Sequence, residues 1–90
     1  MSSQHEEART LEVFQFIRDY IEEKGFSPTL REISVGCLMS RGNLPSYLGR
    51  LEGLGWVVRE YNIPRSIRLG DDAPSREEFD KLWELKKPKI

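Results

Sequence analysis

Five arginines lie between residues 41 and 68, and their side chains have the chemistry to bind phosphate groups and base edges. They are Arg41, Arg50, Arg59, Arg65 and Arg68. Residues 33–70 contain only two acids, Glu52 and Glu60, so this half of the chain carries a net charge of +3. Residues 1–32 carry seven acids and four bases, a net charge of −3. Because phosphate binding depends on a local patch, this asymmetry favours a nucleic-acid interface in the basic half, although the whole chain has a charge of −1.

Several polar side chains precede or begin a predicted third helix in the basic half. The candidate DNA-contacting residues here are Ser40, Arg41, Asn43, Ser46, Tyr47 and Arg50. Arginine suits guanine and asparagine suits adenine, and a good bidentate pair contributes about 1 to 3 kcal/mol of discrimination between bases. We expect Arg50, one turn further along, to meet phosphate rather than a base. Asn43 is equally suited to cap the helix, and Tyr47 to pack in the core.

Two further groups of candidates flank that helix. Thr29 and Arg31 begin the second helix, where backbone N–H groups and the helix dipole would attract a phosphate, and Thr29 is also a helix cap. Around a predicted hairpin lie Arg59, Tyr61, Asn62, Arg65 and Arg68. These side chains would straddle the DNA backbone or enter the minor groove. Solvated arginines on a hairpin are common, so a purely structural role stays open for each.

Other classes of function have little support in the sequence. Cys37 is the only cysteine and lacks a disulfide or zinc partner, and His5 is the only histidine. There is no Gly-rich phosphate loop, paired-carboxylate motif or metal-ligand spacing, so we expect no enzyme activity, no cofactor and no metal. We expect Cys37 to be a buried thiol rather than a redox sensor. Without a secretory signal or an apolar run of roughly 18 to 20 residues, the chain is expected in the cytoplasm.

Apolar spacing and capping signals predict the elements that position these residues. A helical repeat predicts a first helix at roughly residues 4–24, which Gly25 ends. Thr29 and Glu32 form the capping box of a short second helix that Gly36 ends. We expect the side chains of Phe26, Leu30 and Ile33 to face the core.

The third predicted helix lies within residues 40–54. Its apolar stripe consists of Leu44, Tyr47 or Leu48, Leu51 and Leu54. Pro45 suits only a first turn, which favours Asn43 as the N-cap and leaves Ser40 as the alternative. Residues 56–69 then alternate as a hairpin of two short strands around the turn YNIPR.

The chain closes with a predicted helix that Ser75 caps and that ends near Lys86. Its apolar face consists of Phe79, Leu82 and Trp83. A face this apolar should dock, either on its own domain beside Trp56 or on a second copy as a dimer interface.

The order of helix, sharp corner, helix, turn, helix and hairpin predicts a winged helix-turn-helix over residues 1–70. This is an α+β fold that is mainly α, and residues 71–90 add a linker and an amphipathic helix. The stretches LEVFQFIRDYIEEKGFSPTLREI, LPSYLGRLEGLG and PRSIRL resemble the N-terminal DNA-binding domain of LexA-type repressors. The most specific part is GFSPTLREI, which resembles the family corner Gly-aromatic-Pro-Pro-Thr-x-x-Glu-Ile. The likeness covers about residues 9–69 and implies a domain that binds operator DNA.

Three departures limit what this resemblance implies. The turn Gly36-Cys37-Leu38-Met39 is about one residue shorter than the family turn with its leucine-glycine pair. The run Ser40-Arg41-Gly42-Asn43 replaces the common Ser-Pro-Asn, and proline is displaced to Pro45. Residues 71–90 do not resemble the start of the self-cleaving peptidase domain, so the chain is expected to be a stand-alone relative or a fragment.

The sequence therefore predicts a DNA-binding transcriptional regulator that acts as a repressor. The helix within residues 40–54 would read the major groove, and the 56–69 wing would meet the backbone or the minor groove. The alternative is a winged-helix interaction module that binds a protein such as RNA polymerase or another regulator. Its binding surface would be the apolar face of the last helix together with the acidic first helix.

Overall fold

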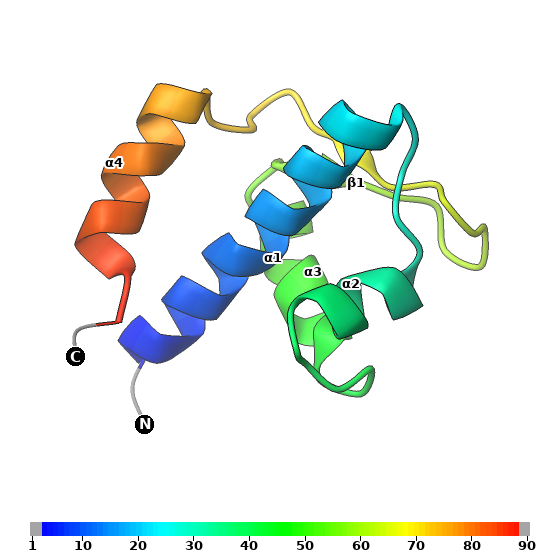
Figure 1. Cartoon of the computed structure of the whole chain (residues 1–90), viewed down its shortest axis with the longest axis horizontal. Helices are drawn as coiled ribbons and strands as arrows, with labels where there is room; N and C mark the ends of the chain where they lie inside the picture. The colour runs from blue at the N-terminus through cyan, green and yellow to red at the C-terminus, as the bar shows by residue number, and fades with distance from the viewer. Residues whose placement is uncertain (1–2, 89–90) are drawn as a thin grey trace.

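A computed structural model describes residues 3–88, in which one long helix forms the centre of the fold (Figure 1). The helices are α1 (Ser3–Lys24), α2 (Leu30–Gly36), α3 (Leu44–Gly53) and α4 (Arg76–Lys86), and the strands are β1 (Val57–Val58) and β2 (Arg68–Leu69). The helices α2, α3 and α4 all contact α1, with α4 on one side and α2 and α3 on the other. This arrangement confirms the predicted winged helix-turn-helix with an extra C-terminal helix.

One apolar core joins the four helices and β1. Its buried members are Leu11, Val13, Phe14, Ile17, Ile33, Leu44, Leu48, Leu51, Val57, Ile67 and Phe79. Phe14 of α1 contacts two other aromatic side chains. Its ring centroid lies 5.1 Å from that of Trp56 and 5.7 Å from that of Phe79 in α4. Fully burying a side chain of this size stabilises a fold by roughly 1.5 to 3 kcal/mol, so these buried side chains hold the helices together.

The corner between α1 and α2 has the predicted capping. Gly25 adopts a left-handed φ of 82°. The Thr29 hydroxyl accepts from the Glu32 backbone N–H at 3.1 Å, and the Glu32 carboxylate accepts from the Thr29 N–H at 2.8 Å. These two bonds satisfy donors that the first turn of a helix leaves unpaired.

Two apolar residues of this corner do not face the core as predicted. Phe26 is 50% exposed and packs edge-on against the Tyr20 ring, with 5.9 Å between centroids. Leu30 is also exposed, because the seven-residue α2 presents only Ile33 and Ser34 to the interior. The prediction failed because a helix of two turns has room for few inward residues.

The third helix begins where the favoured prediction put it, with Asn43 at the N-cap position before Leu44, but the capping bond differs. Asn43 has helical backbone angles and makes no side-chain capping bond. Instead, the Ser40 hydroxyl accepts from the Asn43 N–H at 3.2 Å, and the Ser40 carbonyl accepts from the Leu44 N–H at 3.2 Å. Ser40, the alternative, therefore caps the turn that leads into α3. The Asn43 side chain is left exposed for other contacts.

The apolar stripe of α3 consists of Leu44, Leu48 and Leu51, all buried. Tyr47 is half-buried beside it. Leu54 does not belong to the stripe: it is 51% exposed, because α3 ends at Gly53 and Leu54 lies past the last turn.

The predicted hairpin is present with very short strands. β1 pairs antiparallel with β2, and Val57 lies opposite Leu69 and Val58 opposite Arg68. Val57 and Ile67 point into the core. We call residues 56–69 the wing; its loop turns at Asn62 and Arg65, which have left-handed φ values of 66° and 57°.

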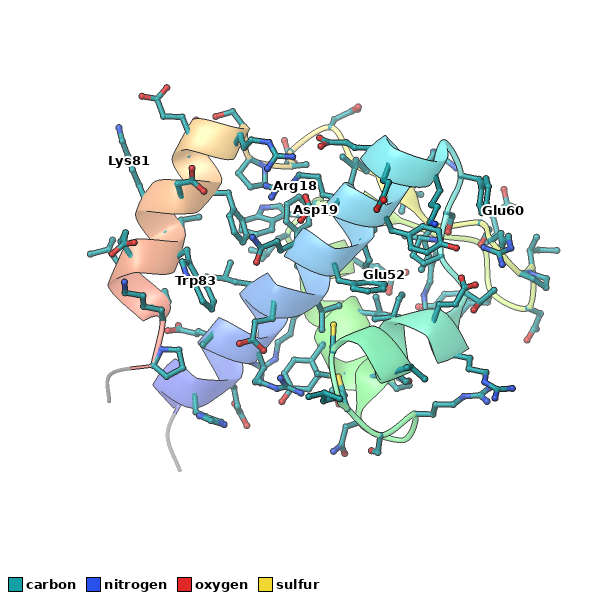
Figure 2. All side chains as sticks on the ribbon, in the orientation of Figure 1. Arg18, Asp19, Glu52, Glu60, Lys81 and Trp83 are labelled. Atoms are coloured by element: carbon teal, nitrogen blue, oxygen red, sulfur yellow. The ribbon has the colours of Figure 1, made fainter. Side chains whose placement is uncertain are left out.

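The last helix docks on its own domain. Ser75 caps α4 through a capping box with Glu78, as predicted. Phe79 is buried against α1, and Figure 2 shows Trp83 on the side of α4 that faces α1 and Lys81 on the opposite side. None of the described helices combines the length and the hydropathy of a membrane span.

Candidate nucleic-acid interface

An open groove of about 340 Å³ separates the start of α2 from the wing. One wall consists of residues 28–31 together with Arg41, and the other consists of residues 59–67. The groove therefore lies between the helix-turn-helix unit and the hairpin, the two parts from which the sequence predicted DNA contacts.

Three predicted arginines have guanidinium groups that are free to bind a ligand. Arg31, Arg41 and Arg68 are exposed, and none of them makes an ion pair within residues 3–88. Arg31 and Arg41 both border the groove, although ten residues separate them in the sequence. A planar guanidinium binds phosphate oxygens or the guanine edge in a bidentate manner, so these side chains suit either contact.

The polar side chains that precede and begin α3 are also accessible. Ser40, Asn43 and Ser46 are exposed, although the Ser40 hydroxyl accepts a capping bond. Thr29 is similarly occupied in the capping box of α2. The exposed amide of Asn43 is the group in this set that is suited to bind adenine.

Arg50 does not lie with the other candidates. Its guanidinium pairs with the Glu6 carboxylate of α1 at 2.8 Å and lies 5.9 Å from the Tyr47 ring centroid. This pair raises the pKa of Arg50 and lowers the pKa of Glu6. Arg50 borders a different, apolar groove between α1, α3 and α4, which also includes Leu11, Trp56 and Leu82.

Arg59 in the wing is paired with the body of the domain. It binds the Glu52 carboxylate of α3 at 3.2 Å, and its guanidinium lies 4.4 Å from the Tyr61 ring centroid. The Tyr61 hydroxyl donates to the same carboxylate at 3.0 Å. With its side chain only 10% exposed, Arg59 has little surface left for DNA.

Arg65 is also paired, in this case with α2. Its two terminal nitrogens donate to the two oxygens of Glu32, each at 3.1 Å. The Arg65 hydrogen bond, followed by that of the Thr29 N–H, lowers the pKa of Glu32 from 4.5 to about 2. Asn62 stays exposed at the tip of the wing.

The anchoring role of the acids was missed at the sequence level. Glu32 was identified as a cap, but nothing near it in the sequence indicates Arg65, which lies 33 residues away. Glu52 and Arg59 are seven residues apart, so their pairing also depends on the turn between α3 and the wing. The groove additionally includes Ile63, whose exposed side chain the sequence analysis did not select.

Cys37 carries no sign of a reactive thiol. It is half-buried, and this burial raises its pKa to about 11, so the thiol is protonated at neutral pH. Among residues 3–88 no three His, Cys, Asp or Glu side chains converge as metal ligands.

The geometry agrees with a comparison of the sequence with known families. Residues 6–66 match the LexA DNA binding domain family. The chain belongs to this family. The match covers α1, α2, α3 and most of the wing, which are the parts that form the groove. The last helix, α4, lies outside the matched residues.

Individual LexA repressors give the same result. The chain is 40% identical over 78 residues to the LexA repressor of Exiguobacterium sp., which covers 83% of this chain and 37% of that protein. It is 35% identical over 71 residues to that of Lactobacillus acidophilus, covering 77% of this chain and 34% of the relative. It is 32% identical over 74 residues to the LexA repressor of Lactobacillus helveticus, and this match covers 81% of this chain and 36% of the relative. The chain thus spans little more than a third of the length of these relatives.

Proposed function

We propose that this chain is a sequence-specific DNA-binding domain of a transcriptional repressor. The observation that carries the proposal is the set of unpaired, exposed arginines, Arg31, Arg41 and Arg68, around the start of α3 and on the wing. Its membership of the LexA DNA-binding domain family and its similarity to LexA repressors support the same function.

In this proposal α3 enters the major groove of double-stranded DNA with its N-terminal end. Arg41 and Asn43 lie beside that end with exposed side chains, so they are placed to bind base edges. Arg31 on α2 and Arg68 on β2 bind phosphates on either side, and Asn62 at the wing tip reaches the backbone or the minor groove. Phosphate contacts set the position of α3, and base contacts provide specificity.

The test combines selection from a random DNA pool with mobility shifts at several salt concentrations. An enriched sequence is expected, with an affinity that falls steeply as salt rises because counterions are released. Arg31→Ala should reduce the salt slope by about one, and Arg41→Ala should cost about 1 to 3 kcal/mol and relax the sequence preference.

Arg50→Ala is the matched control for these variants. It removes another exposed arginine, on α3, but one that is paired with Glu6 and directed away from the groove. DNA binding should therefore change little. Equal losses for Arg31→Ala, Arg41→Ala and Arg50→Ala would contradict the proposed orientation, and an unselective pool would contradict sequence-specific binding.

We also propose that two copies act together on DNA, because a dimer gains affinity from two half-sites about one helical turn or a multiple apart. Phe79 is buried within its own chain, so an α4 contact between copies would rest on Leu82, Trp83 and the exposed Leu85. Sedimentation of the intact chain and of Trp83→Ala tests this. Monomers at concentrations well above those needed for DNA binding would exclude such a dimer.

The alternative of a protein-interaction module has less support now that Phe79 is known to be buried. It required an exposed apolar face on α4, and the largest buried member of that face, Phe79, packs against Phe14. No contact in residues 3–88 favours RNA polymerase as a partner.

A further inference from the structure

Arg65 in the loop of the wing makes several hydrogen bonds to the helical body. One terminal nitrogen donates to the Ser27 carbonyl at 2.8 Å and to one Glu32 oxygen at 3.1 Å, and the other donates to the second Glu32 oxygen at 3.1 Å. The guanidinium carbon lies 5.0 Å from the Phe26 ring centroid, and Tyr20 lies 3.4 Å from the first nitrogen. These partners come from α1, the corner and α2, so Arg65 joins the wing to three segments.

The acceptor Glu32 has a second task at the same time. One of its oxygens also accepts from the Thr29 N–H and completes the capping box of α2. A single carboxylate therefore links the start of α2 to the loop of the wing across the groove. The left-handed backbone at Arg65, with φ of 57°, directs the side chain from the loop to this carboxylate.

The end of the Arg65 guanidinium formed by its two terminal nitrogens is already occupied in this geometry. Its terminal nitrogens already bind a carboxylate in the bidentate arrangement that a phosphate would require. To bind at this end of the guanidinium, a phosphate would have to displace Glu32 from a pair in which the guanidinium carbon also lies 5.0 Å from the Phe26 ring centroid. Arg68 and Asn62, by contrast, are exposed without such partners and remain available to DNA.

We propose that Arg65 is a positioning residue that fixes the wing to α2 through Glu32, rather than a phosphate contact. This inference rests on the proposed DNA-binding function. The groove between α2 and the wing keeps its width because Arg65 holds both walls. Releasing the wing lowers the fraction of molecules whose wing and α3 fit DNA together, and the apparent affinity falls in proportion to that fraction.

Glu32→Gln separates this role from a direct electrostatic one by the sign of its effect. Glutamine at this position still completes a capping box, because Gln and Glu both serve there. The variant removes a negative charge and frees Arg65, so a phosphate-binding Arg65 predicts tighter binding to DNA. A positioning Arg65 predicts weaker binding although the domain has become more positive.

The experiment uses the full chain and the DNA sequence selected above, with Glu32→Gln, Arg65→Gln and the double variant. We expect each single variant to lose about three- to ten-fold in affinity, corresponding to a wing that is correctly placed in roughly a third to a tenth of molecules. The double variant should lose no more than either single variant, because both break one interaction. The salt slope should stay unchanged for Arg65→Gln, whereas Arg31→Ala reduces it by about one.

Equal or tighter binding of Glu32→Gln, or a salt slope reduced by about one in Arg65→Gln, would overturn the inference. Amide hydrogen exchange of residues 59–66 without DNA gives an independent readout, and faster exchange is expected in both single variants while α1 and α3 stay protected. If the wild-type chain binds no DNA, the proposed function is lost. The positioning of the wing is then judged by this exchange alone, and unchanged exchange overturns it.

Discussion

The wing and α4 attach to the same helical body by different physical means. The loop of the wing is joined to α2 and α3 by exposed or partly exposed ion pairs, Arg65 with Glu32 and Arg59 with Glu52, whereas Val57 and Ile67 at the base of the wing are buried in the core. By contrast, α4 is joined to α1 by a buried aromatic side chain, Phe79, whose ring contacts Phe14. In Figure 1 the wing and α4 lie at opposite ends of the molecule.

The difference shows which attachment suits adjustment and which suits permanence. Exposed ion pairs are screened by salt and contribute little to overall stability, so they set the position of a segment without making it rigid. A buried aromatic ring contributes much more, because its removal leaves a cavity. The loop of the wing beside the proposed DNA site thus has the weaker, charge-dependent attachment, and α4, although it also makes exposed ion pairs with α1, has the stronger, apolar one.

The largest effect is expected from Phe79→Ala, which should lower the free energy of unfolding by about 3 to 5 kcal/mol. The reason is that Phe79 is only 1% exposed and fills the space between α1 and α4. Denaturant unfolding measures the loss. Leu85→Ala on the same helix, where the side chain is 70% exposed, is the control and should change stability little. Similar losses in both variants would mean that α4 is rotated or undocked.

Arg18 gives a smaller test of whether the α4 attachment depends on packing or on charge. Its guanidinium lies 5.0 Å from the Phe79 ring centroid in the space between α1 and α4, and its Nη1 has no partner among residues 3–88 (Figure 2). Replacing a buried charge with an apolar side chain of similar size is often neutral or stabilising, so Arg18→Met should stay within about 1 kcal/mol of wild type or exceed it.

Arg18→Ala is the matched variant, and it should destabilise the domain because it removes the same packed stem without replacing it. Thermal unfolding of both proteins separates the two effects. If Arg18→Met were as unstable as Arg18→Ala, the Arg18 charge over the Phe79 ring would help to hold α4, and the comparison with the wing would fail.

The smallest expected effect on stability concerns the pH dependence of the wing pair. Arg65 and the Thr29 N–H lower the pKa of Glu32 from 4.5 to about 2. A carboxyl group whose pKa is lowered in the folded state stabilises the fold at pH values above its pKa in the unfolded state. That contribution is lost as the pH falls from about 4.5 towards 2. NMR titration of the Glu32 carboxyl measures the shift directly.

Arg65→Gln should return the pKa of Glu32 part of the way to 4.5 and leave the rest of the shift to the Thr29 N–H. This titration tests the pairing of Arg65 with Glu32 without any DNA. A Glu32 carboxyl in the wild-type chain that titrates near 4.5 would mean that the wing pair does not persist in solution.

Local signals predicted most of the fold. Gly25, the capping box of Thr29 with Glu32, and that of Ser75 with Glu78 fixed two helix starts and one stop within a residue or two, because each depends on neighbours along the chain. Asn43 has the predicted N-cap position of α3, but the side-chain bond comes from Ser40, and the local sequence left both residues open as caps. Leu54 was placed in the core from helical spacing, which does not record where a short helix ends. Phe26 was placed there because it follows the stop at Gly25, but it stays exposed and packs against Tyr20 instead.

The candidate site was predicted as a set of residue types rather than as an arrangement. Arg31 and Arg41 border the groove as the charge pattern indicated, and Arg50 does not. From the sequence, the five arginines between residues 41 and 68 looked chemically alike. Nothing in their local context separated those with acidic partners from those without.

The sequence by itself determined the helices, their caps, the hairpin and the family, because these depend on spacing and on groups a few residues apart. Only the tertiary structure decided which arginines are free, because their partners are distant in the chain: Glu32 lies 33 residues from Arg65, and Glu6 lies 44 residues from Arg50. The fold brings these carboxylates within hydrogen-bond distance of two guanidinium groups and leaves Arg31, Arg41 and Arg68 without acidic partners in residues 3–88. An ion pair forms when a carboxylate and a guanidinium lie close together in space, and that distance is set by how α1, α2 and the wing pack around the core.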